Sequence, residues 1–131
     1  MNLRRDVVIL ACAISAGIHG ALAPEHFEEG AGAGLGFVAA TVLLAFLAAY
    51  LTRRPTQLAL AATVAVFGGL IVSYGLAITT GVPGLHPEPE AVDGLALVTK
   101  AVEVIGLLVA ASQLRRPRLG FHFTQAKGHV T

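Results

Sequence analysis

Long runs of apolar residues dominate the chain, and short polar segments separate them. Four of these runs reach the length of about 20 residues with which a helix crosses about 30 Å of hydrocarbon. They lie at roughly 7–23, 31–51, 58–79 and 95–114. None alternates like a barrel strand, and an open sheet edge cannot satisfy its backbone groups in lipid. The pattern therefore predicts an all-α integral membrane protein, a bundle of four transmembrane helices with short loops.

Prolines and arginine pairs mark the boundaries between these runs. Pro24 follows the first run, Arg53-Arg54-Pro55 follows the second, and Pro117 follows the fourth. We expect a single transmembrane domain over residues 1–114 and a polar cytoplasmic tail over residues 115–131.

Composition supports lipid as the solvent of this chain. Of its 131 residues, 55% are hydrophobic and only 13% are charged, and the mean hydropathy is +0.74. So few charges could not cover the surface of a soluble domain. Basic residues form no stripe interleaved with aromatic ones, which argues against a nucleic-acid partner. The single cysteine, Cys12, excludes a disulfide or a four-thiolate zinc site within one chain.

Apart from Asp6, which lies beside Arg4 and Arg5, charged residues outside the runs divide by sign between the two sides of a four-span threading. The cations on one side are Arg4, Arg5, Arg53, Arg54, Arg115, Arg116, Arg118 and Lys127. The carboxylates on the other side are Glu25, Glu28, Glu29, Glu88, Glu90 and Asp93. Positively charged loops stay in the cytoplasm. We therefore expect a multi-pass protein of the plasma (inner) membrane with both termini cytoplasmic.

The first run also has features of a secretory signal, because basic residues precede it and Ala21-Leu22-Ala23 ends it. Pro24 argues against cleavage there, since proline fixes φ and removes the backbone donor needed for extended binding to a peptidase. A lipoprotein signal at Cys12 is a poorer match. We expect the first run to remain as a helix.

Small residues predict close helix packing. The second run opens with glycines in small-xxx-small spacing, such as Gly30 with Gly34 and Gly32 with Gly36. Such glycine-rich faces could also contact other membrane subunits or a second copy of the chain.

Among the polar side chains within the apolar runs, four are the most informative because of their depth in the predicted bundle: His19, Tyr74, Lys100 and Glu103. Lys100 and Glu103 are three residues apart, so they share a helix face and can pair. A lone charge at the centre of a membrane costs about 2.5–3.5 kcal/mol on insertion scales. We expect these side chains to point into the bundle as one cluster, either as a functional site or as a pair that only sets helix register.

Histidines and carboxylates gather on the side predicted to face outward. Imidazole with carboxylate suits copper or zinc, and the candidate ligands are His19, His26, His86, Glu25, Glu29 and Glu88. No spacing among them is diagnostic of a metal site, and a solvated acidic loop explains the same residues. His19 and His26 can share one ion only if the chain folds back after Pro24, because seven helical residues span about 10 Å.

The segment from Ser15 to Glu29 contains His19 followed, five residues further on, by Pro24-Glu25-His26-Phe27-Glu28-Glu29. This H-x6-H motif ending in P-E-H-x-x-E resembles the first-helix signature of small uncharacterised four-span membrane proteins of bacteria, chiefly actinobacteria. The resemblance covers one helix and its loop, together with the number of spans. It implies membership of that family and places His19, Glu25, His26 and Glu29 in one motif, but it implies no established chemistry.

Three classes of function remain open. The first is a membrane protein that binds or transfers a transition metal, copper or zinc, through its outward histidines and carboxylates. The second is a non-enzymatic accessory or assembly subunit of a membrane complex. The third is a proton-linked transporter that uses Glu103, Lys100 and His19, although no repeat or broken helix supports it. Haem is disfavoured because His19 is the one histidine within a run, and an enzyme is disfavoured because no serine has a paired base at a recognisable spacing.

The charge pattern predicts the topology. A reporter fused after Thr131 or inserted at Thr56 should report a cytoplasmic location, whereas reporters inserted near Glu29 or Glu90 should report the outside. An outward C-terminus would contradict the four-span threading.

Overall fold

The chain forms four long α-helices in a computed structural model that describes residues 2–84 and 87–115. They are α1 (Leu3–Glu29), α2 (Ala31–Arg53), α3 (Gln57–Thr79) and α4 (Gly94–Gln113). All four are long and apolar enough to cross a membrane. The prediction of an all-α, four-helix integral membrane protein is confirmed. The predicted tail lies largely outside the described residues.

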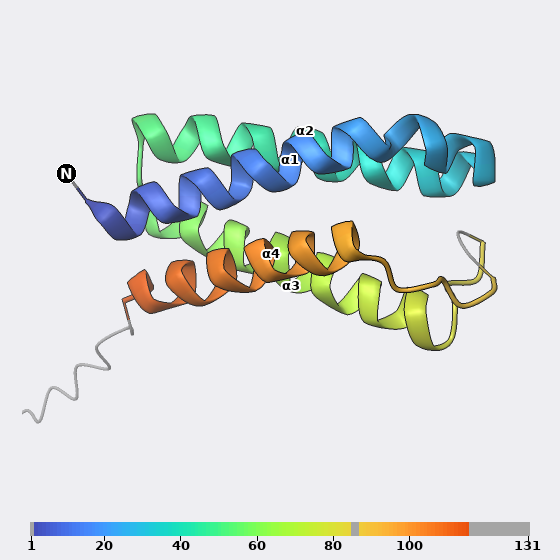
Figure 1. The fold of residues 1–131 in the computed structure, drawn as a ribbon. Helices are drawn as coiled ribbons and strands as arrows, with labels where there is room; N and C mark the ends of the chain where they lie inside the picture. The colour runs from blue at the N-terminus through green and yellow to red at the C-terminus, as the bar shows by residue number, and fades with distance from the viewer. Residues whose placement is uncertain (1, 85–86, 116–131) are drawn as a thin grey trace, which may run out of the picture.

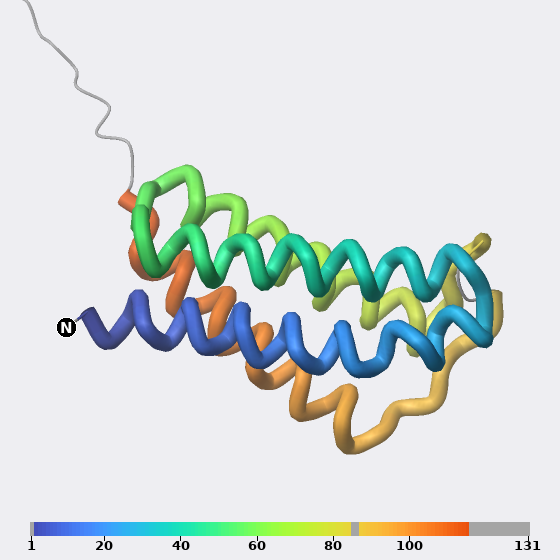
Figure 2. The backbone as a smooth tube through the Cα atoms, turned by 90° about the horizontal axis from the view of Figure 1, so that it is seen from above, coloured from blue at the N-terminus to red at the C-terminus, as the bar shows by residue number. Residues whose placement is uncertain are grey.

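The helices pack as an up-and-down bundle in which each contacts the two next to it around the ring (Figures 1 and 2). The N-terminus, the α2–α3 connection and the end of α4 lie at one end of the bundle. We call it the basic end, after Arg4, Arg5, Arg53, Arg54 and Arg115. The α1–α2 turn and the α3–α4 connection lie at the opposite end. We call this the acidic end, after Glu25, Glu28, Glu29, Glu88, Glu90 and Asp93.

Side-chain caps begin three of the helices. The Asn2, Thr56 and Asp93 side chains accept hydrogen bonds from the backbone N–H groups of residues 5, 59 and 96. These bonds satisfy donors that the first helical turn leaves without partners. The cap at Asp93 fixes where α4 starts, and α4 therefore begins well short of the acidic end reached by α1 (Figure 1).

Helix α1 continues through Pro24 to Glu29, which corrects the predicted end of the first span at residue 23. Proline removes one backbone donor from a helix, but a membrane-spanning helix can tolerate this when its surroundings compensate. The chain therefore does not fold back after Pro24. His26 stays on α1, two turns and about 10 Å along the axis from His19, so the condition for both histidines to share one ion is not met.

The core is centred on Phe67 of α3, whose side chain is fully buried. Its ring packs where Gly106 of α4 and Ala11 of α1 leave room for it. Near the acidic end, Gly34 of α2 likewise leaves room for the ring of Phe27. Large apolar side chains such as Leu35, Phe46, Val72 and Leu108 are exposed on the outside of the bundle. A lipid environment accounts for this exposure.

Replacing Gly106 by alanine should destabilise the bundle. The added Cβ would lie 2.5 Å from Phe67 Cε2 and 2.8 Å from Ala11 Cβ, and such overpacking typically costs about 1–3 kcal/mol. Thermal unfolding of the detergent-extracted protein, followed by circular dichroism, measures the loss. The matched control is Gly69→Ala, because a Cβ there meets no atom within 4 Å. Equal unfolding temperatures for the two variants would contradict this packing.

Candidate functional site

A partly open cavity of about 420 Å³ lies between the helices at the acidic end. Its walls include apolar side chains such as Leu22, Phe37 and Leu70. Its polar lining comes from α1, α3, α4 and the connection before α4: His19, Glu25, His26, Glu29, Ser73, Tyr74, Glu90, Asp93, Thr99 and Lys100. The cavity therefore joins carboxylates of the acidic end to polar groups deeper in the bundle.

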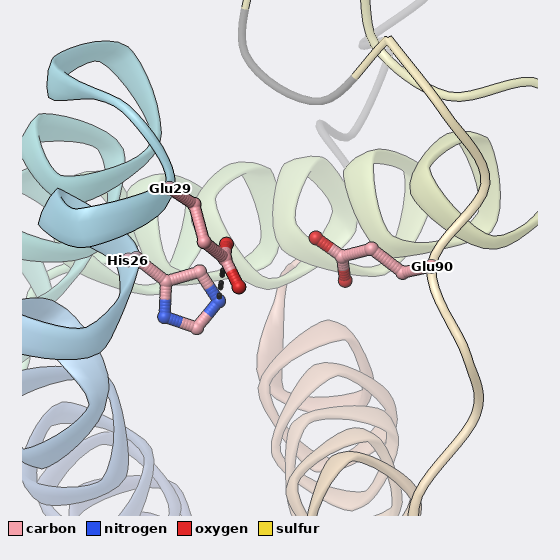
Figure 3. Close-up of side chains that lie close together, drawn as sticks. All are labelled: His26, Glu29 and Glu90. Atoms are coloured by element: carbon pink, nitrogen blue, oxygen red, sulfur yellow. Dashed lines mark ion pairs between the residues drawn. The ribbon is translucent and has the colours of Figure 1, made fainter.

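Three of the lining residues form what we call the acidic-end cluster: His26, Glu29 and Glu90. One potential ligand atom from each lies within 4.8 Å of the others. His26 and Glu29 extend from the last turns of α1, and Glu90 faces them from the connection that leads to α4 (Figure 3). His26 Nε2 is 4.0 Å from Glu29 Oε2. Nitrogen and carboxylate oxygen ligands thus converge from two separate parts of the chain.

The imidazole of His26 is held in one orientation. Its Nδ1 lies 2.9 Å from the carbonyl oxygen of Leu22, and a carbonyl can only accept, so Nδ1 carries the proton and donates. Nε2 is thereby directed toward the Glu29 carboxylate. The ring also stacks on Phe37 of α2, with 3.6 Å between ring centroids. Metal-binding histidines are commonly oriented by such a hydrogen bond from the second ring nitrogen.

Glu90 is held near α1 by its backbone. Its N–H donates to the carbonyl oxygen of Ala77 at 2.9 Å. Ala77 lies in the last turn of α3, where carbonyls lack partners within the helix. This bond ties the connection to α3 and so brings the Glu90 carboxylate opposite His26.

A second group, which we call the buried cluster, lies deeper: Ser15, His19, Lys100 and Glu103. The Glu103 carboxylate is fully buried. Its Oε1 accepts a hydrogen bond of 2.8 Å from Ser15 Oγ of α1, and its Oε2 pairs with the Lys100 ammonium one turn away on α4. Both oxygens of a charge within the membrane are thereby partnered.

His19 joins this cluster from α1. Its Nδ1 donates to the carbonyl oxygen of Ser15 at 2.9 Å, and its Nε2 lies 3.9 Å from Glu103 Oε1, beyond hydrogen-bonding distance. The Lys100 ammonium lies 5.3 Å from the centre of the Tyr74 ring, within the range of a cation–π contact. The buried Tyr74 hydroxyl has no hydrogen-bond partner among the described residues.

The structure thus separates the candidate metal ligands predicted from the sequence. His26 and Glu29 lie together, His19 belongs to the buried cluster, and Glu25 lines the cavity outside the acidic-end cluster. Glu88 is exposed, and His86 lies outside the described residues. The predicted intramembrane residues His19, Tyr74, Lys100 and Glu103 lie near one another, and the first three line the cavity.

Three residues of the site were not selected from the sequence. Ser15 could have been found, because it lies four residues before His19 and therefore on the same helix face. Phe37 carries no distinguishing signal in an apolar run. Glu90 was not chosen over Glu88, because the backbone bond that positions Glu90 is not visible in the sequence.

Comparison with known proteins gives no further assignment: no family model, no curated protein and no solved structure matches the chain. Of the resemblance drawn from the first-helix motif, the structure supports the four membrane-spanning helices.

The buried pair of Lys100 and Glu103 predicts how two substitutions change the free energy of unfolding. Glu103→Ala should destabilise the protein by about 3–5 kcal/mol, because it leaves the Lys100 ammonium without a partner inside the bundle. The double variant Glu103→Leu with Lys100→Leu should recover most of this loss, since it removes both charges together. Denaturant unfolding in detergent measures both effects, with the exposed Glu88→Ala as the control. A double variant no more stable than Glu103→Ala would refute the pairing.

Proposed function

We propose that the protein binds a divalent transition-metal ion, zinc or copper, at the acidic-end cluster. The observation that carries this proposal is the convergence of one imidazole and two carboxylates within 4.8 Å at the wall of a cavity. The orientation of His26 supports it, because the bond from Nδ1 to Leu22 directs Nε2 toward the Glu29 carboxylate, 4.0 Å away.

The charge of the ligands suits a divalent ion. Glu29 and Glu90 together supply two negative charges, and a neutral imidazole adds none. One doubly charged ion therefore leaves the cluster neutral. Nitrogen and oxygen ligands without a thiolate favour Zn²⁺ or Cu²⁺ over Cu⁺.

The ligand atoms of the acidic-end cluster need to move only slightly closer together to hold an ion. Ligand atoms around a tetrahedral zinc ion lie about 3.4 Å apart, given metal–ligand distances of about 2.0–2.1 Å. The ligand atoms here are separated by up to 4.8 Å. The Glu29 side chain is 46% exposed, and Glu90 lies in a connection rather than in a helix. Both carboxylates can therefore move toward the fixed imidazole.

The partition of charge between the two ends supports an orientation for this activity. With the basic end in the cytoplasm, the acidic end faces outward across the plasma membrane. The cluster would then take its ion from the external side.

Zinc binding to chelator-free, detergent-extracted protein tests the proposal. Equilibrium dialysis followed by elemental analysis should give one tightly held zinc ion per chain. His26→Gln should weaken its affinity at least tenfold, because even changes to groups that merely orient a ligand cost about 10–100-fold. Glu29→Gln should act in the same direction, since it removes one of the two negative charges.

The matched control is Glu28→Gln, which removes the same charge from the neighbouring position on α1. Glu28 is exposed and does not line the cavity, so zinc affinity should stay close to that of the wild type. Equal losses in Glu28→Gln and Glu29→Gln would indicate only a general attraction of cations to an acidic surface. No zinc binding by the wild-type protein would refute the proposal and favour the accessory-subunit function.

A further inference from the structure

The geometry of α1 points to a second, inner position for the same ion, between His19 and Glu103, which we infer is kept weak by the Lys100 ammonium. This inference rests on the proposed function, because it concerns the ion bound at the acidic-end cluster. It adds a second site in the same cavity and a role for Lys100.

Helix α1 presents the same histidine arrangement twice. His26 and His19 each donate from Nδ1 to the carbonyl four residues earlier, at 2.9 Å in both cases. Each then directs Nε2 toward a carboxylate, 4.0 Å from Glu29 Oε2 and 3.9 Å from Glu103 Oε1 respectively. Seven residues separate the two histidines, so they lie on one face of α1, about 10 Å apart along the axis.

Two acceptor atoms also face each other at the inner position, His19 Nε2 and Glu103 Oε1. With Nδ1 of His19 donating to a carbonyl, the lone pair on Nε2 of the neutral ring faces the negatively charged oxygen of Glu103. Two acceptors that face each other at 3.9 Å repel unless a positive species lies between them. The spacing is about 0.5 Å wider than that of two ligands on one tetrahedral zinc ion. A metal ion would turn this repulsion into attraction.

The two imidazoles face the same cavity. His26 and His19 both line it, so an ion in the cavity can reach either ring, although Glu103 itself does not line it. Phe37 of α2 lies against both imidazoles, with ring centroids 3.6 Å from His26 and 5.2 Å from His19.

Lys100 opposes occupation of the inner position. Its ammonium neutralises Glu103, so a divalent ion added there would give the group a net charge of two. At the acidic-end cluster the same ion would give a net charge of zero. In a region of low dielectric this difference strongly disfavours the inner position.

Lys100 also has an alternative place for its ammonium. It lies 5.3 Å from the centre of the Tyr74 ring, and its side chain lines the cavity. When an ion displaces the ammonium from Glu103, the ring face of Tyr74 can keep it by a cation–π contact. The Tyr74 hydroxyl, which makes no hydrogen bond within residues 2–84 and 87–115, adds a polar group on the same side chain.

The test removes the acidic-end cluster and the opposing charge together. In His26→Gln, zinc binding should be weak. In His26→Gln with Lys100→Met, one zinc ion should bind at least tenfold more tightly than in His26→Gln alone, because the opposing charge has been removed. Adding His19→Gln should abolish that gain. Equilibrium dialysis with a zinc salt gives affinity and stoichiometry for each full-length variant in detergent.

The two proposals fail in different ways. If the double variant binds no more tightly than His26→Gln, or if its gain survives His19→Gln, the inner position is refuted, and wild-type zinc binding still supports the acidic-end cluster. If the wild type binds no zinc, the proposed function fails whatever the double variant does.

A more conservative variant tests the same inference if Lys100→Met does not fold. Lys100→Gln retains a donor for Glu103 without the charge, and it replaces Lys100→Met if the latter does not fold. Zinc should also raise the thermal unfolding temperature of the His26→Gln, Lys100→Gln variant and should not raise it after His19→Gln. A purely structural role for Lys100 predicts no zinc-dependent change in either variant.

Discussion

The fully buried carboxylate of Glu103 is the constraint on which the arrangement of the bundle depends. A charge inside a membrane must be paired and hydrogen-bonded, and the partners here come from two helices. Lys100 lies on the same helix as Glu103, whereas Ser15 lies on α1. A slide of α1 against α4 by one residue would separate Ser15 from Glu103. The pairing therefore fixes the relative depth of the two helices, and with it the positions of His19 and His26 along the cavity.

The fold was predictable because the bilayer imposes a length and a composition on every helix that crosses it. The predicted spans agree with α2, α3 and α4 to within about one turn. The error came at Pro24, where a rule about local backbone geometry was used to end the first span. The rule holds for isolated helices, but the neighbours of α1 are not visible in a local pattern. That error mattered, because the position of His26 depends on whether α1 continues.

Some contacts of the site join residues that are close in sequence, whereas others join residues that are far apart. Lys100 with Glu103, and Ser15 with His19, lie one helical turn apart, so the sequence alone places each pair on one face. Glu90 reaches His26 because of a backbone bond to Ala77 on a different element. Nothing in the run Glu88-Pro89-Glu90 distinguishes the two carboxylates before the chain is folded. Sequence analysis therefore included His26 and Glu29 among its candidates but not Glu90, the third member of the cluster.

The two clusters differ in what holds them, and this difference bears on how a bound ion would behave. The carboxylates of the acidic end lie in an exposed helix end and a connection, so they can adjust to an ion and release it again. Glu103 is fixed by a serine and a lysine and cannot adjust in this way. On the proposed function, affinity would decrease along the cavity from the acidic end toward the centre. A deep site with high affinity would trap a divalent ion where the surroundings offer the least solvation. On the same inference, the ammonium of Lys100 beside Glu103 keeps binding at the inner position weak.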